Sequence, residues 1–221
     1  MTTSRFRNYY WAALGYVVLV ILWGALVRAT GSGAGCGSHW PTCNGAVVPL
    51  EGGTKTFIEL THRVTSGLSV LVVIAQLVWA RRLYPSGHRV RAAAGYAMLF
   101  MAVEVLIGAA IVKLHYVADN QSIARAWWMA IHLCNTFLLL GALTLTAHWS
   151  GGAPTIRFRG RSAWLGTATL VAMLVTGATG GIAALGDTLR PASNTGGAVA
   201  ELSATGELLV QLRILHPFVA C

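Results

Sequence analysis

Residues 10–27 read YWAALGYVVLVILWGALV, a run of eighteen residues without a charged side chain. Such a run is close to the roughly 20 residues that an α-helix needs to cross a bilayer. Four more apolar stretches follow at 65–80, 92–112, 126–147 and 163–185, and a sixth begins near residue 210. The second stretch reaches spanning length only if its helix starts before Thr65. The sequence therefore predicts an all-α polytopic membrane protein.

The composition excludes soluble and disordered proteins. Charged residues make up 10% of the chain, against about 25% in an ordinary soluble domain. Hydrophobic residues make up 55%, and the mean hydropathy is +0.62. A chain this apolar has the lipid bilayer as its first partner.

The net charge of +9 is a topology signal and does not indicate nucleic-acid binding. Nine arginines lie before the first stretch and in the loops after the second and fourth stretches, with no acid among them: Arg5, Arg7, Arg81, Arg82, Arg89, Arg91, Arg157, Arg159 and Arg161. By the positive-inside rule, we expect a protein of the plasma membrane with its N-terminus on the cytoplasmic side. The first helix is too long for the apolar core of a cleavable signal, so we expect it to remain as an anchor.

A weak internal repeat predicts the domain organisation. Gly24-Ala25 recurs as Gly177-Ala178, and His62 recurs as His216, at offsets of 153 and 154 residues. We expect residues 1–150 to form a four-helix transmembrane half. Residues 151–221 would then be the start of a second, pseudo-symmetric four-helix bundle.

Three histidines are expected at similar depth, towards the outer face. His62, His132 and His216 each lie near the outer end of a helix that runs inwards. Ionisable side chains at such positions pair, bind a ligand or line a cavity. Two of them could hold a haem between facing helices, or they could form hydrogen bonds between helices.

The segment Glu59-Leu60-Thr61-His62-Arg63 places an acid, a histidine and a cation on one helix face. Glu59 could act as a base beside a ligand at His62, and Arg63 could bind a haem propionate. Alternatively, these residues have a structural role, in which Thr56 and Glu59 form a capping box and Glu59 and Arg63 form an ion pair. The second copy keeps His216 but has no matching acid, so chemistry is expected at Glu59.

Three further residues are candidates. Cys36 and Cys43 lie in an outer loop, where a disulfide is plausible. That bond would be either structural or exchangeable with a thiol-disulfide oxidoreductase. Glu104 lies within the third apolar stretch, where a carboxylate is either a functional group, for example in proton handling, or part of an interhelical hydrogen bond.

These motifs together resemble the haem A synthase family. The resemblance is carried by GALVRATGSG at 24–33, GCGSHWPTCNG at 35–45, ELTHR at 59–63, and His132 with Asn135-Thr136. It is close over residues 1–150 and looser over 163–221. The combination of the Cys-Trp-Pro-Cys loop with the following Glu-x-x-His-Arg segment makes it specific.

The resemblance implies an eight-helix enzyme in two four-helix halves. Members oxidise the C8 methyl group of haem O, through a hydroxymethyl, to the formyl group of haem A for terminal oxidases. Haem O, delivered by haem O synthase, would be ligated by His62 and His132, with Glu59 as the catalytic acid. His216 would ligate a haem b iron cofactor that passes electrons to an acceptor.

The resemblance also implies a disulfide between Cys36 and Cys43. Because the chain ends within the sixth helix, the partner ligand of His216 is missing, which implies a fragment truncated in its C-terminal half.

Two other functions remain open from the residues. A bis-His membrane b-type cytochrome would transfer electrons and hold haem B without modifying it. A transporter or assembly factor that exchanges thiols at its outer cysteines would hold no haem. The resemblance favours the synthase.

Overall fold

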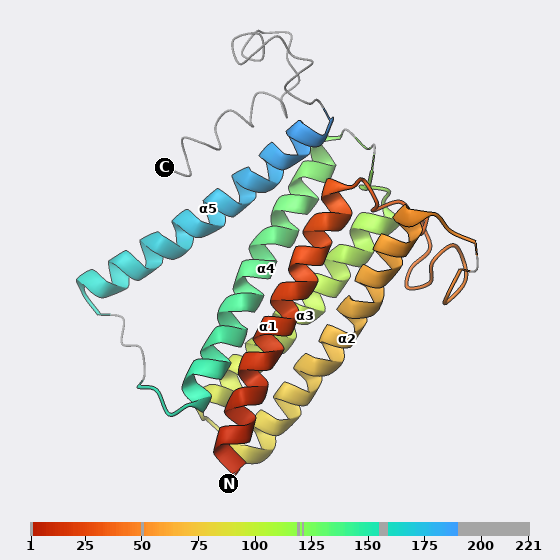
Figure 1. The fold of residues 1–221 in the computed structure, drawn as a ribbon. Helices are drawn as coiled ribbons and strands as arrows, with labels where there is room; N and C mark the ends of the chain where they lie inside the picture. The colour runs from red at the N-terminus through yellow and green to blue at the C-terminus, as the bar shows by residue number, and fades with distance from the viewer. Residues whose placement is uncertain (1, 50, 119, 121, 155–158, 190–221) are drawn as a thin grey trace. The chain divides into compact units, whose positions relative to one another are not determined.

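The computed structural model describes residues 2–49, 51–118, 120, 122–154 and 159–189. Five α-helices follow one another: α1 (Thr2–Ala29), α2 (Thr54–Leu83), α3 (Arg89–Lys113), α4 (Ile123–Ser150) and α5 (Arg161–Leu189) (Figure 1). No strand occurs among the described residues; the one β-bridge joins Cys43 and Ala46. The predicted all-α class is confirmed.

All five helices are long and apolar enough to cross a membrane, as the sequence predicts. They extend beyond the apolar stretches because polar residues continue the helices at both ends. The largest difference is α2, which begins at Thr54 after Gly53 and not near Thr65. His62 is therefore in the third turn of α2 and does not open the helix.

The chain divides into two compact units. One consists of 1–118 with 135–156, and the other of 119–134 with 157–221. The predicted division of the chain at residue 150 remains a prediction. The expected sixth helix and His216 lie outside the described residues.

The core of the first unit is a four-helix bundle. Its central cluster takes Val17 from α1, Val73 from α2, Met101 from α3 and Leu143 from α4, all at most 3% exposed. Burying such side chains against one another excludes lipid from the centre of the bundle. The four helices that the sequence predicts for this half thus share one core.

Three aromatic side chains of α1 fix its register against α2. Tyr9 donates a hydrogen bond to the carbonyl of Val72 (2.7 Å), Tyr16 to that of Thr65 (2.9 Å), and Trp23 to that of Ile58 (3.0 Å). Donors and acceptors both recur every seven residues, which keeps them on one face of each antiparallel helix. This aromatic ladder runs along α1 from Tyr9 to Trp23, the residue before Gly24.

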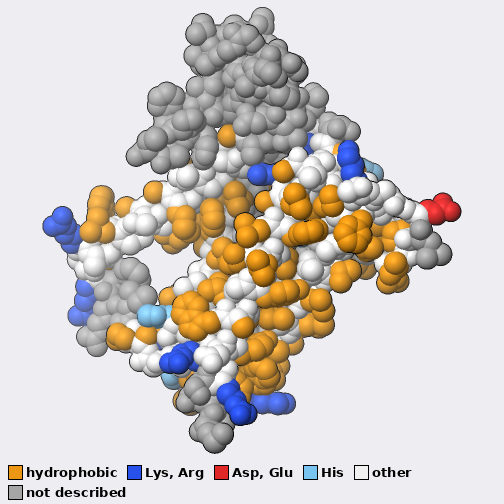
Figure 2. Space-filling model, viewed as in Figure 1, with side chains coloured by type: hydrophobic (Ala, Val, Ile, Leu, Met, Phe, Trp, Pro, Cys, Tyr) orange, Lys and Arg blue, Asp and Glu red, His pale blue; other side chains and the backbone are white. Residues whose placement is uncertain are grey.

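The side chains that face outwards suit a bilayer. Leu19, Leu22, Leu71 and Leu106 are each at least 60% exposed on the first unit. Figure 2 shows hydrophobic side chains spread along the helices, with basic side chains near the N-terminus. The protein is therefore a multi-pass membrane protein, and the cytoplasmic location of its N-terminus remains a prediction.

In the second unit, α5 packs on the first part of α4. The Cys134 thiol lies 3.7 Å from the Leu174 carbonyl. Gly181 of α5 faces Leu133 of α4, since a Cβ on it would lie 3.7 Å from a methyl group of Leu133.

Candidate functional site

A disulfide closes the loop between α1 and α2. Cys36 and Cys43 are bonded to each other, and both are completely buried. Backbone hydrogen bonds from Asn44 to Cys36 (3.0 Å) and between Cys43 and Ala46 complete a tight turn. We call residues 35–46 the disulfide loop.

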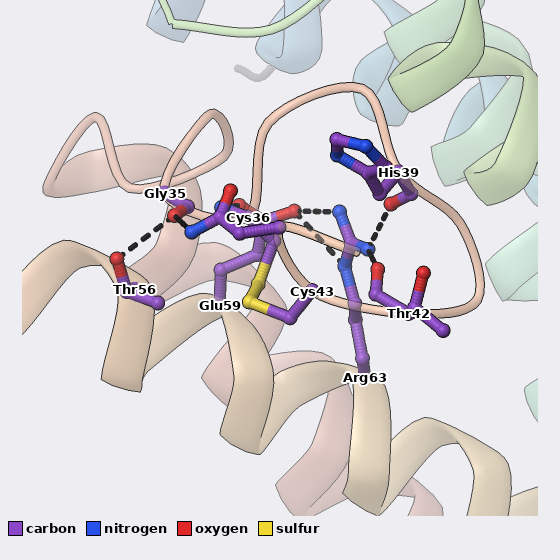
Figure 3. The surroundings of a disulfide bond; sticks show 9 residues. Gly35, Cys36, His39, Thr42, Cys43, Thr56, Glu59 and Arg63 are labelled. Carbon is purple, nitrogen blue, oxygen red and sulfur yellow. Dashed lines mark hydrogen bonds and ion pairs between the residues drawn. A yellow bond between two sulfur atoms is a disulfide. The ribbon is translucent and has the colours of Figure 1, made fainter. Parts of the chain in front are cut away.

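The disulfide loop packs on the first turn of α2. A Cβ on Gly35 would lie 2.5 Å from backbone atoms of Lys55, so only glycine permits this approach. The hydroxyl of Thr56 donates to the Gly35 carbonyl at 2.8 Å (Figure 3). The capping-box interpretation of Thr56 is wrong, since α2 begins after Gly53 without a side-chain cap.

Glu59 joins the loop to the helix. Its side chain is buried, and Oε2 accepts a hydrogen bond from the Cys36 backbone N–H at 2.8 Å. Its Oε1 accepts from both Nε (3.0 Å) and an Nη of Arg63, one turn later. Figure 3 shows the carboxylate between the disulfide and the guanidinium. The ion pair that the sequence offered as an alternative is thus present.

Arg63 also holds the far side of the disulfide loop. Its second Nη donates to the carbonyls of His39 and Thr42, the latter at 2.6 Å. The guanidinium is therefore committed to Glu59 and to the loop backbone. In this arrangement, Arg63 acts as a clamp, and the predicted contact with a propionate would require it to exchange partners.

His62 lies against α1 at Gly24. A Cβ on Gly24 would be 2.9 Å from Cε1 and 3.2 Å from Nε2 of the imidazole. Any side chain at position 24 would take the space that the ring edge occupies. Trp23 donates a hydrogen bond from its indole N–H to the Ile58 carbonyl. This bond fixes the register that brings Gly24 opposite His62.

Glu104 bonds α3 to α4. Its two carboxylate oxygens accept from the Asn135 amide and the Thr136 hydroxyl. The same amide donates to the Phe100 carbonyl at 2.9 Å, one turn before Glu104. Of the two roles open for Glu104, the interhelical hydrogen bond is the one the geometry contains.

His132 belongs to the second unit, in the part of α4 that precedes Asn135. It is half-buried, as is His62. Counted from the first residue of each helix, His62 is the ninth residue of α2 and His132 is the tenth residue of α4, and their similar depth remains a prediction. Among the described residues, no three His, Cys, Asp or Glu side chains form a group that could hold a bare metal ion.

Sequence reasoning missed two of these contacts. The close approach of Gly24 to His62 had a weak signal, a glycine within a run of bulky residues. The contacts of Arg63 with loop carbonyls had none, because backbone acceptors leave no mark in a sequence.

Comparisons with known proteins agree with the motifs. The family model described as cytochrome oxidase assembly protein matches residues 7–54 and 51–220. A Thermus thermophilus protein named Protoheme IX farnesyltransferase is 49% identical over 221 residues, which cover 98% of this chain and 36% of that protein.

Two similar proteins are named Heme A synthase. That of Alkalihalophilus pseudofirmus is 36% identical over 124 residues, covering 52% of this chain and 42% of that protein. That of Bacillus cereus strain AH187 is 40% identical over 96 residues, covering 43% and 31%. The matches therefore span about a third to two fifths of these relatives. No solved structure matches this chain.

Proposed function

Since this chain belongs to the cytochrome oxidase assembly protein family, we propose that it is part of a haem A synthase. In this proposal, the C8 methyl group of haem O is oxidised to a formyl group at the loop end of the first unit. The observation that carries the proposal is the buried Glu59, held beside the disulfide loop one turn before His62.

We propose His62 as a haem ligand, because imidazole is a common axial ligand of haem iron. The ring edge that carries Nε2 lies against Gly24 of α1, where a side chain would displace it. His132, in α4, is the proposed second ligand of haem O. The proposed cofactor, haem b at His216, would provide a path for the electrons removed from the substrate.

Glu59 is the proposed proton acceptor. Conversion of a methyl to a formyl group removes protons, and a carboxylate near the reacting carbon can take them. Arg63 and the Cys36 N–H hold both carboxylate oxygens in one orientation. The disulfide loop therefore positions this acid, which gives a reason for its close packing on α2.

Prenyl transfer is the second candidate, because the Thermus thermophilus relative is named as a farnesyltransferase. Transfer from a prenyl diphosphate needs cations to stabilise the leaving group, commonly Mg²⁺ held by several carboxylates. This chain has just two aspartates, Asp119 and Asp187. The match to this chain covers 36% of that relative. We therefore assign the transferase name to the part of that protein outside the match.

Analysis of bound haems by chromatography and mass spectrometry tests the proposal. The chain would be purified from cells that make haem O. We expect haem O with its hydroxymethyl or formyl product from the parent chain, and haem O alone from Glu59→Gln. Glu51→Gln, at an exposed acid of the same connection, is the matched control and should retain product.

Three results would contradict the proposal. Product at the normal rate from Glu59→Gln would remove Glu59 from the chemistry. Haem B alone in the parent chain would favour the electron-transferring cytochrome. Farnesylation of protohaem by the purified chain would favour the transferase.

A further inference from the structure

The face of α1 that meets His62 also carries a cation. Arg28 is four residues after Gly24, so the two residues lie on one face of the helix. It is half-buried, next to the buried Val27, in the last turn of an otherwise apolar span. Its Cα lies about 6 Å further along the helix axis than that of Gly24, towards the disulfide loop.

Arg28 has no counter-ion in the part of the chain that the structure describes. The ion pair found there joins Arg63 to Glu59, and no hydrogen bond of the Arg28 guanidinium to a described residue exists. Cations near the end of a membrane span normally pair or reach water. Arg28 is therefore the cation of this helix end that remains available for an anionic ligand.

The other cations near the disulfide loop are less suited to that task. Arg63 is committed to Glu59 and to two loop carbonyls. Lys55 is exposed on the first turn of α2. A ligand held at His62 would meet Arg28 without disturbing the clamp that holds Glu59.

We propose that Arg28 binds a carboxylate of the haem that His62 ligates. This inference rests on the proposed function, since it needs a haem at His62. A porphyrin carries its carboxylates on one edge, and the cost of burying an anion turns that edge towards the helix end, where Arg28 lies. A guanidinium can hold a carboxylate through two parallel hydrogen bonds.

The test compares iron protoporphyrin IX with its dimethyl ester, which lacks the anionic charge. Both would be titrated into the purified full chain in detergent, with binding followed by the Soret band. The parent chain should prefer the free acid by about tenfold or more. Arg28→Gln should lose this preference, whereas Lys55→Gln should keep it.

Arg28→Lys guards against misfolding of the first variant. It retains the charge and loses the two-point geometry, so we expect a preference reduced several-fold but not abolished. An unchanged preference in either Arg28 variant overturns the proposal.

A His62→Ala variant separates this inference from the proposed function. If the parent chain binds haem, His62→Ala shifts its Soret band, and Arg28→Gln keeps the preference, only the role of Arg28 is wrong. If the parent chain binds neither porphyrin, both proposals fail.

Discussion

Replacing Gly24 with alanine tests whether α1 determines the position of His62. The new Cβ would lie 2.9 Å from Cε1 of the imidazole, whereas carbon atoms in contact are about 3.5–4.0 Å apart. The ring would have to retreat by about 0.6–1.1 Å. Overpacking of this kind costs about 1–3 kcal/mol. If haem binding needs the present ring position, affinity should fall about 5- to 150-fold.

Gly15→Ala is the matched control on the same helix. Gly15 is exposed, and a Cβ there would meet no atom within 4 Å. Both substitutions replace a glycine inside α1 and gain similar helix propensity, up to about 1 kcal/mol. The difference between the two variants therefore reports the contact with His62.

Titration with iron protoporphyrin IX would give the dissociation constant and the Soret maximum of each variant. Thermal unfolding followed by circular dichroism would show whether either variant is destabilised. We expect Gly24→Ala to bind more weakly, with a shifted Soret band, and Gly15→Ala to match the parent chain. Equal affinity and equal spectra in the two variants would refute the role of Gly24.

Three other substitutions probe the contacts around the site. Cys36→Ser opens the disulfide loop and should cost about 2.5 kcal/mol of stability. The unfolding temperature should fall, and chemical reduction of the parent chain should lower it in the same way. An unaltered unfolding temperature would argue against a stabilising disulfide. Glu104→Leu removes the acceptors of the Asn135 amide and the Thr136 hydroxyl and should cost about 1–3 kcal/mol in thermal unfolding, and a neutral effect would contradict the hydrogen bonds described. Tyr16→Phe removes the donor to the Thr65 carbonyl and should cost about 0.5–1.5 kcal/mol in the same assay, where full stability would show that the bond contributes nothing.

The helices could be predicted from the sequence because lipid imposes a simple rule. Every spanning segment must be apolar over its length, and five such segments were identified from residues alone. Their ends could not be located, since residues such as Thr54 and Glu59 are polar and yet helical. Helix ends depend on local hydrogen bonds with the loops, which hydropathy does not describe.

The candidate site could be predicted in part. The period of the helix places Glu59 and Arg63 on one face, and the structure contains their ion pair. The commitment of Arg63 to the carbonyl of Thr42 could not be predicted, because it depends on how the loop folds back over α2. The proposed roles of His62, His132 and Glu59 in haem chemistry remain predictions.

The aromatic ladder divides mutational tolerance unequally between its two helices. The donors on α1 are side chains, so Tyr9, Tyr16 and Trp23 cannot be exchanged for aliphatic residues without loss. The acceptors on α2 are backbone carbonyls, which every amino acid supplies equally. During divergence, α2 can therefore vary its sequence along this contact while α1 is constrained, and a shift of one turn would break all three rungs together.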